Sequence, residues 1–357
     1  MDIIAHIEPF YQVEFKDEKR TVKNLSKPIN LNLLITKKCN ANCVHCCASA
    51  NETTEEITLE NAKKIVDIAR KNYVFYFVIT GGEPLTHTHF WDILDLIKDE
   101  FGIILNTNGT LIDEKTAKRL SEYDIASIHI SLDAPNENIY EKQRGNTTKL
   151  SEVICGIKNL VKYNANVTTK FIITNLNKNY LEEVIDLSES LGVKRMSLAW
   201  FKSVGRGLSN EDQLLIKGEE VKKISEKLYE LREKHKDKIF LSFDDTQCFP
   251  FLFKDIKNLK YRKLCGDFFF RVNYNGDVYP CPFMENKVGN VLEENLISIW
   301  NHPELLQQRK LAWGKNLKGV CQDCKQNIIC AGGCRARAIS AYQSIDQKDP
   351  LCWVKND

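Results

Sequence analysis

From about residue 31 to residue 200, segments with the hydrophobic pattern of strands alternate with segments with the hydrophobic pattern of helices. Short apolar runs typical of buried strands are separated by longer stretches in which apolar residues recur every three or four positions, as in amphipathic helices. The run YVFYFVIT predicts a strand over 73–80, and LENAKKIVDIARKN predicts a helix over 59–72. The other expected strands are 31–36, 102–107, 125–132, 168–175 and 193–200, and the other expected helices are 89–100, 114–123, 151–164 and 180–192.

Strands that alternate with helices indicate parallel pairing, because a helical crossover returns the chain to the same end of the sheet. The pattern contains six such strand–helix steps, which is two short of the eight that close a complete β/α barrel. Either an open barrel of six units or a doubly wound sheet fits this α/β pattern. Both place ligands at the carboxyl ends of the strands.

The pattern changes on both sides of this alternation. The first residues predict a short hairpin, FYQVEFK and TVKNL around a charged DEKR turn, and residues 211–238 predict a long polar helix. FFFRVNYNGDVYP (268–280) predicts a second hairpin, with Asn275-Gly276 as a type I′ turn. The expected units are an N-terminal hairpin extension (1–30), a β/α barrel (31–205), a helical linker (206–245) and a cysteine-rich C-terminal domain (246–357).

Composition excludes several classes of partner. The chain has 50 Lys and Arg against 48 Asp and Glu, so no charge bias points to nucleic acid or to an anionic membrane. The start MDIIAHIEPF is not a signal peptide, and the longest apolar run is too short to cross a bilayer. We therefore expect a cytoplasmic protein. Its thirteen cysteines then serve metal binding, catalysis or packing rather than disulfides, because the cytosol keeps thiols reduced.

Four of these cysteines lie in KKCNANCVHCCASA, directly after the first strand of the alternation. Cys39, Cys43 and Cys46 have the spacing C-x3-C-x2-C, and thiolates on one loop at the end of a strand can converge on one site. Three thiolates suit a [4Fe–4S] cluster with one iron left open. A structural zinc ion would need four ligands, of which Cys47 could supply the fourth.

CNANCVHC resembles the cluster motif of the radical S-adenosylmethionine (SAM) superfamily, in which an aromatic residue precedes the last cysteine; His45 takes that place here. By this motif Cys47 is a spare thiol. TGGEPL (80–85), which ends the next strand, resembles the segment that holds the SAM amino group in this superfamily. The glycines let the backbone approach the ligand and a carboxylate can pair with an ammonium. The residues that the resemblance assigns to this segment are Gly81, Gly82, Glu83 and Pro84.

The same resemblance implies three further SAM contacts. Ser131 would contact the ribose or carboxylate, Arg144 would pair with the carboxylate, and Asn108 would line the same pocket. It also implies a partial (β/α)6 barrel in which a [4Fe–4S] cluster binds SAM. The expected chemistry is reductive cleavage of SAM to a 5′-deoxyadenosyl radical that abstracts a hydrogen atom from the substrate.

The spacing of the C-terminal cysteines, taken alone, is compatible with either a zinc site or an iron–sulfur cluster. Their string closely resembles the SPASM extension of radical SAM enzymes, which holds two auxiliary [4Fe–4S] clusters. By resemblance, one cluster has the ligands Cys321, Cys324, Cys330 and Cys352, and the other has Cys265, Cys281 and Cys334.

The second of these clusters lacks an obvious fourth ligand. Cys248 is the nearest candidate; alternatively the iron is open to substrate, and Cys248 is a hydrogen-atom donor near the active site or is inert. Cys155, in VICGI, is expected to pack in the core.

The resemblance limits the range of possible substrates but does not identify one. Most SPASM enzymes modify ribosomally synthesised peptides by forming crosslinks or thioethers or by epimerising residues. Only 38 residues precede Cys39, so leader recognition is expected to use the small hairpin or a separate leader-binding protein. The alternatives are tetrapyrrole side-chain decarboxylation in haem synthesis, sulfatase formylglycine maturation, another small-molecule substrate, and a non-enzymatic zinc scaffold. A flavodoxin or ferredoxin is expected to donate the electron.

Overall fold

The computed structural model describes residues 13–16, 19–22, 25–244, 266–312 and 314–354. Within these ranges the largest element is a ten-stranded sheet in the order β12-β11-β10-β3-β4-β5-β6-β7-β8-β9. Its six central strands are β3 (Asn30–Leu34), β4 (Tyr76–Thr80), β5 (Gly102–Thr107), β6 (Ile125–Ser131), β7 (Val167–Ile173) and β8 (Arg195–Trp200). Each of them pairs in parallel with the next.

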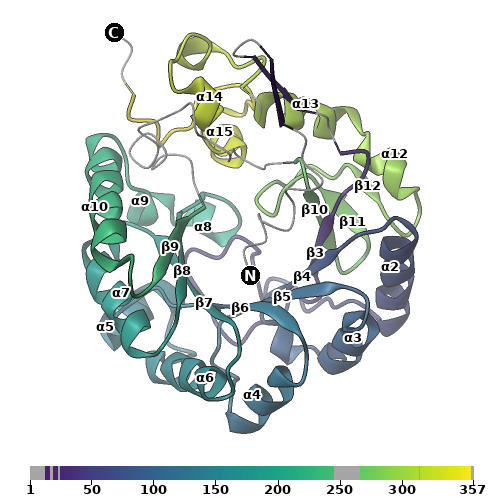
Figure 1. The fold of residues 1–357 in the computed structure, drawn as a ribbon, viewed down its shortest axis with the longest axis vertical. Coiled ribbons are helices and arrows are strands. Elements are labelled where there is room, and N and C mark those ends of the chain that lie inside the picture. Colours follow the sequence, from purple (N-terminus) through teal and green to yellow (C-terminus); the bar gives the residue numbers. More distant parts are fainter. Residues whose placement is uncertain (1–12, 17–18, 23–24, 245–265, 313, 355–357) are drawn as a thin grey trace.

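Helices lie outside the curved sheet, so that the sheet forms the inner wall of an incomplete barrel (Figure 1). They are α2 (Leu59–Lys71), α3 (Phe90–Ile97), α4 (Glu114–Ser121), α5 (Glu137–Arg144), α6 (Leu150–Lys162) and α7 (Leu181–Ser190). The expected α/β class and partial barrel are confirmed. The doubly wound alternative is excluded, because a doubly wound sheet would carry helices on both faces.

Successive side chains of each strand point alternately to the hydrophobic core under the helices and to the inside of the barrel. Leu31 and Leu33 of β3 are buried in the main hydrophobic core under the helices. Asn32 lies between them and therefore points to the opposite face, into the barrel. The same alternation along β5 and β6 places Asn106 and His129 inside, next to each other in register. These three interior positions are polar, while most of the residues beside them on the outer face are apolar.

Two further strands extend the parallel sheet beyond the six that were expected. β9 (Phe240–Phe243) pairs with β8, and β10 (Phe269–Asn273) pairs with β3. β10 also forms the expected hairpin with β11 (Asp277–Tyr279), and β12 (Gly289–Asn290) adds to its edge. Phe270 and Val272 share the core of the barrel, so the C-terminal hairpin is hydrogen-bonded into the barrel sheet.

Two local expectations were wrong. The helix expected over 211–238 is divided into α9 (Glu211–Leu214) and α10 (Glu219–His235), because Leu215 is extended and Gly218 has a φ of 64°. The turn at Asn275-Gly276 is not type I′, since of its two residues only Gly276 has a positive φ. The loop has three residues, and the amide of Gly276 donates to the carbonyl of Asn273 at 2.9 Å, as in a type I turn followed by a glycine bulge.

The remaining elements precede and follow the barrel strands in the chain. β1 (Val13–Lys16) and β2 (Lys19–Val22) pair antiparallel, as the sequence predicts for the first hairpin. The short helix α8 (Arg206–Ser209) follows β8. The C-terminal helices are α12 (Leu296–Trp300), α13 (Pro303–Ala312), α14 (Asn327–Cys330) and α15 (Arg335–Tyr342).

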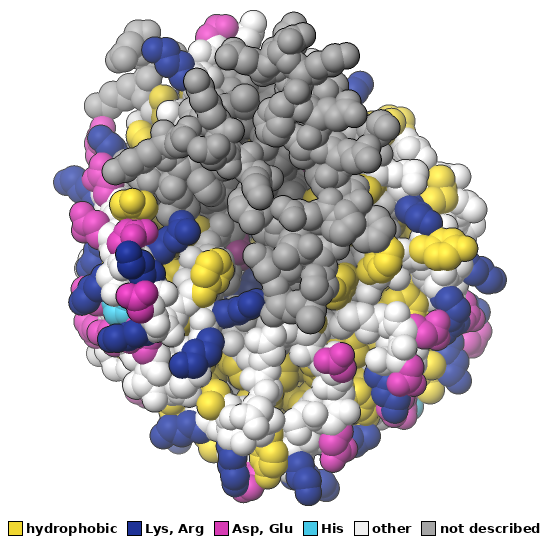
Figure 2. Space-filling model, viewed as in Figure 1, with side chains coloured by type: hydrophobic (Ala, Val, Ile, Leu, Met, Phe, Trp, Pro, Cys, Tyr) yellow, Lys and Arg dark blue, Asp and Glu magenta, His cyan; other side chains and the backbone are white. Residues whose placement is uncertain are grey.

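Charged side chains are mixed on the face shown in Figure 2, including along the edge where α10 lies. This agrees with the polar character expected for this segment, because mixed charges along a helix are typical of a solvated face. Among the helices of the described ranges, none combines the length and apolar character that a membrane span requires.

Candidate functional site

The cysteine loop lies at the carboxyl end of β3 and is held by backbone contacts from several elements. The amide of Val44 donates to the carbonyl of Gln143 at the end of α5, and the amide of Cys39 donates to Oδ1 of Asn51 at 2.8 Å. Asn51 has a φ of 71°, a conformation that asparagine tolerates better than most residues. These hydrogen bonds connect the cysteine loop to α5 and to Asn51.

The segment SVGRG (203–207) supports the same loop from the other side. Arg206 donates from Nη1 to the carbonyl of Cys43 at 3.2 Å, and the amide of Gly207 donates to the carbonyl of Cys46 at 3.3 Å. A Cβ on Gly205 would lie 2.6 Å from the carbonyl oxygen of Cys47, and Gly205 has a φ of 56°. Only glycine allows this close approach, which explains the glycine at this position.

The thiols of Cys39, Cys43 and Cys46 converge. Burial raises the pKa of Cys39 to about 11, and the nearby Cys43 and Cys46 thiols add to the rise. Burial also raises the pKa of Cys43, against the opposing effect of the Arg144 guanidinium. Buried thiols that resist ionisation become thiolates when a metal binds them. These three residues therefore fit a cluster with three protein ligands.

The loop Gly81–Glu83 packs directly against the cysteine loop. A Cβ on Gly82 would lie 2.1 Å from the carbonyl oxygen of Lys38, and the amide of Glu83 donates to that oxygen at 2.8 Å. Pro84 begins the 3-10 helix Pro84–Thr86 that follows. The two glycines thus allow one loop to approach another at the carboxyl ends of β3 and β4.

The Glu83 carboxylate is fully buried and accepts three hydrogen bonds. Its Oε1 accepts from the Thr107 hydroxyl at 2.7 Å and from the Leu85 amide at 3.2 Å, and its Oε2 accepts from the Asn108 amide at 2.7 Å. Burial raises its pKa, and these hydrogen bonds oppose the rise. Glu83 thus joins the ends of β4 and β5. The pairing of its carboxylate with the SAM ammonium stays a prediction.

Asn108 lies beside the cysteine loop. Its Nδ2 donates to Oδ1 of Asn40 at 2.7 Å and lies 4.0 Å from Sγ of Cys39. Ser131 ends β6 between the core residues Ile130 and Leu132, so it points into the barrel. Their contact with SAM stays a prediction.

Arg144 is buried at the end of α5. Its Nε donates to Oδ2 of Asp133 at 2.9 Å, and its Nη1 lies 3.6 Å from Sγ of Cys43. Nε2 of His45 lies 3.5 Å from the same Asp133 oxygen, and burial lowers the pKa of His45 to about 4. The other oxygen of Asp133 accepts from the amide of Ile172 at 2.7 Å. Asp133 therefore joins the cysteine loop, α5 and β7.

Sequence reasoning missed Asp133. The available signal was its position in SLDAP, immediately after the carboxyl end of a buried strand, where ligand-binding residues of parallel sheets lie. The expectation that Cys155 packs in the core was wrong, because its side chain is exposed on α6.

The second group of thiols surrounds one cavity. Cys321, Cys324, Cys330 and Cys352 all line it, together with Asp349 and Trp353. Burial raises the pKa of Cys321 to about 11, and the other three thiols add to the rise. The four cysteines proposed from the sequence for one auxiliary cluster therefore come together and fit such a group.

Cys281 and Cys334 are buried in one small cluster with Met284. Cys265, their expected companion, and Cys248 lie outside the described residues. The amide of Cys334 donates to Oδ2 of Asp349 at 2.5 Å, and Nη2 of Arg337 pairs with the same oxygen at 2.8 Å. This fully buried ion pair, which the sequence did not reveal, holds the loop that carries Cys352.

Comparison with known proteins agrees with this geometry. Residues 33–191 match the radical SAM superfamily, and residues 265–325 match SPASM, an iron–sulfur cluster-binding domain. The mycofactocin maturase MftC of Mycolicibacterium smegmatis is 28% identical over 341 residues, covering 92% of this chain and 84% of MftC. The AdoMet-dependent heme synthase of Methanosarcina barkeri is 25% identical over 339 residues, covering 89% of this chain and 94% of that protein.

Among solved structures, SuiB of Streptococcus suis bound to its precursor peptide SuiA has a TM-score of 0.72 at 17% identity, covering 91% of this chain and 76% of SuiB. SuiB has also been solved with S-adenosylmethionine. The chain carries a radical SAM domain over residues 33–191 and a SPASM domain over residues 265–325. It is an enzyme whose cofactors are SAM and [4Fe–4S] clusters, one in the barrel and auxiliary ones in the SPASM domain. The non-enzymatic zinc scaffold is therefore not supported.

Proposed function

We propose that the enzyme modifies a ribosomally synthesised peptide by abstracting a hydrogen atom from it. The product would be a crosslink, a thioether or an epimerised residue. The relationship to mycofactocin maturase, which extends over nearly all of this chain, supports this class of substrate. SuiB, which has the same fold, binds a precursor peptide.

The observation that carries the proposal is the row of neutral polar side chains inside the barrel. Strand alternation directs Asn32, Asn106, His129 and Ser197 inward. Nδ1 of His129 lies 2.9 Å from Oδ1 of Asn106, and burial together with the nearby Lys170 charge lowers the pKa of His129 well below 6.5. Uncharged donors and acceptors of this kind match the amide groups of a peptide.

In this proposal Cys39, Cys43 and Cys46 hold the cluster that binds SAM. When bound, the cluster and SAM supply a one-electron reductive cleavage that prepares hydrogen abstraction. Arg144 would place a fixed positive charge beside the SAM carboxylate, because Asp133 holds its guanidinium. Gly81–Pro84, Asn108 and Ser131 would line the rest of the SAM site.

The SPASM thiols would hold the auxiliary clusters, with Cys321, Cys324, Cys330 and Cys352 around one of them. A flavodoxin or ferredoxin would supply the electron. The hairpin β1–β2 or a separate protein would bind the leader of the peptide.

The proposal is tested by co-expressing the chain with any short reading frame beside its gene and measuring the mass of that peptide. A mass change that depends on SAM and is lost in Cys43→Ala supports peptide modification. An unchanged peptide, with the clusters loaded and SAM cleaved, would contradict it.

A second candidate is side-chain decarboxylation of a tetrapyrrole. The relationship to AdoMet-dependent heme synthase covers 94% of that protein. The interior also carries two cations, Lys170 on β7 and Arg271 on β10, and cations of this kind pair with propionates. Lys170 already lies 3.3 Å from Asp244, and Nη1 of Arg271 donates to the carbonyl of Pro282.

The absorption spectrum of an iron porphyrin that carries propionates distinguishes the two candidates. A Soret shift on mixing with the cluster-loaded enzyme, weakened in Arg271→Gln, would favour the tetrapyrrole. Absence of a shift would favour the peptide.

A further inference from the structure

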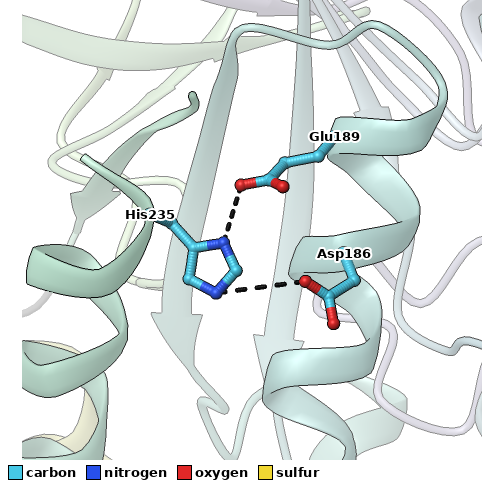
Figure 3. A group of neighbouring side chains, drawn as sticks. All are labelled: Asp186, Glu189 and His235. Carbon is cyan, nitrogen blue, oxygen red and sulfur yellow. Dashed lines mark hydrogen bonds and ion pairs between the residues drawn. The ribbon is translucent and has the colours of Figure 1, made fainter. Parts of the chain in front are cut away.

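Three side chains at the far end of the barrel from the cysteine loop form a group that the radical chemistry does not use. Asp186 and Glu189 lie one turn apart on α7, and His235 is the last residue of α10 (Figure 3). α7 runs back from the carboxyl end of β7 to the amino end of β8, so Glu189 lies near the amino ends of the strands. Cys39 follows the carboxyl end of β3, at the opposite end of the sheet.

The imidazole of His235 has one nitrogen in a short hydrogen bond and one without any. Its Nδ1 lies 2.6 Å from Oε1 of Glu189. A carboxylate only accepts, so Nδ1 carries the proton and Nε2 is left with a lone pair in the neutral ring. The side chain of His235 is 2% exposed, and Nε2 has no hydrogen-bond partner among the described residues. Buried polar atoms in proteins nearly always have a hydrogen-bond partner or bind a water molecule or an ion.

Nε2 points toward a carboxylate. Oδ1 of Asp186 lies 4.0 Å away, which is too far for a hydrogen bond. A zinc ion has bonds of about 2.0–2.1 Å to imidazole nitrogen and about 2.0–2.2 Å to carboxylate oxygen, so an ion between two such atoms holds them at most about 4.3 Å apart. With tetrahedral bond angles the two atoms would lie about 3.4 Å apart, so one bridging ion fits if the exposed Asp186 carboxylate moves toward Nε2 by about 0.6 Å.

The surroundings favour a cation. α7 ends at Ser190 and α10 ends at His235, and the carboxyl end of a helix carries partial negative charge. Asp237 adds a third carboxylate to the hollow that Asp186 and Glu189 line, where Lys194 and Lys238 are the two cations. Lys238 lies 3.5 Å from Oε2 of Glu189, but its own side chain is 71% exposed. Its charge is therefore mostly solvated.

We propose that Asp186 and His235 form a binding site for a divalent transition-metal cation of the zinc class, with Glu189 orienting the imidazole. Imidazole together with a carboxylate suits Zn²⁺, Co²⁺ and Ni²⁺ better than Mg²⁺ or Ca²⁺. A carboxylate on the second ring nitrogen is the usual support of a metal-bound histidine. Asp186 is 59% exposed, so water can complete the coordination. The ion ties α7 to α10.

Zinc titration of the full-length, cluster-loaded enzyme against a chromophoric chelator tests this site. The wild type should bind one more zinc per chain than Asp186→Asn or His235→Gln. Glu189→Gln should weaken that zinc by about 10- to 100-fold. Glu182→Gln is the matched control, because Glu182 joins the same two helices through Lys234 at 2.5 Å and should leave the zinc count unchanged. Zinc that binds to the cysteines adds the same number of ions per chain in every variant, so it does not change the difference between variants.

The location is tested by anomalous scattering at the zinc edge from crystals soaked in Zn²⁺. A peak between Asp186 and His235 is expected. Equal zinc counts in wild type and Asp186→Asn, or a peak only at the cysteines, would overturn the proposal. Asp186→Asn changes an exposed side chain, so misfolding does not confuse this comparison.

Discussion

Asp133 and Arg144 form a buried ion pair at the carboxyl end of the barrel, in which Nε of Arg144 donates to Oδ2 of Asp133 at 2.9 Å. Neither residue is free to move, because Asp133 also accepts from the amide of Ile172. The pair presents the guanidinium to the thiol of Cys43. A fixed cation therefore lies next to a proposed cluster ligand.

Replacing Asp133 by Asn should destabilise the protein strongly. The substitution leaves the Arg144 charge buried without its partner, which typically costs about 3–5 kcal/mol. Chemical denaturation under anaerobic conditions measures this as a lowered midpoint. Asp92→Asn removes an exposed partner of His89 and should shift stability by no more than about 0.5 kcal/mol. Equal effects of the two variants would show that the buried pair is not needed.

Cys43→Ala should abolish cleavage of SAM. A cluster with three thiolate ligands cannot be held by two, and the same loss is expected for Cys39→Ala and Cys46→Ala. The measurement is 5′-deoxyadenosine formed from SAM with a chemical reductant. Cys155→Ala, which removes an exposed thiol on α6, should retain activity. Cleavage by any of the three loop variants would refute the ligand assignment.

Cys324→Ser should remove about four iron atoms per chain, the content of one [4Fe–4S] cluster. The reason is that Cys324 lines the same cavity as three other thiols. Iron and acid-labile sulfide are counted after anaerobic reconstitution, and Cys155→Ser is the control. An unchanged count would mean that this group of cysteines holds no cluster.

Glu83→Gln should weaken the hydrogen bonds that connect the carboxyl ends of β4 and β5, and so lower the free energy of unfolding. Both carboxylate oxygens accept hydrogen bonds, so either orientation of the amide turns an NH₂ group toward a donor. Leaving one buried donor unsatisfied costs about 1–3 kcal/mol. Denaturation without SAM measures this cost.

Glu83→Ala separately tests the SAM contact. If the carboxylate also holds the SAM ammonium, Glu83→Ala should raise the dissociation constant of SAM. An unchanged constant would limit Glu83 to its structural role.

His129 should make stability depend on pH below neutrality. Its folded pKa lies well below 6.5, mainly because of burial. The unfolded chain then binds the proton first as the pH falls. The stability that neutral His129 contributes is complete above about 6.5 and is lost as the pH falls toward the lowered pKa. His129→Asn should therefore lose less stability than the wild type between pH 6.5 and pH 5. Parallel curves for the two proteins would contradict this.

The barrel and the cysteine loop could be predicted because their signals are local. β3–β8 are short apolar runs and the helices repeat apolar positions with period 3.6, and both patterns depend only on neighbours along the chain. The C-x3-C-x2-C spacing places three thiols on one short loop whatever surrounds it. Errors arose where one residue changed the backbone, as Gly218 does when it divides the long helix.

Contacts between distant segments were decided only by the tertiary structure. Arg144 and Cys43 are 101 positions apart, and the curvature of the sheet brings them together. The same holds for Gly205 against Cys47 and for Asp186 and His235 at the far end of the barrel. Sequence periodicity specifies which face of each element is buried. Which side chains meet across that face depends on register, crossover length and packing, which no local pattern records.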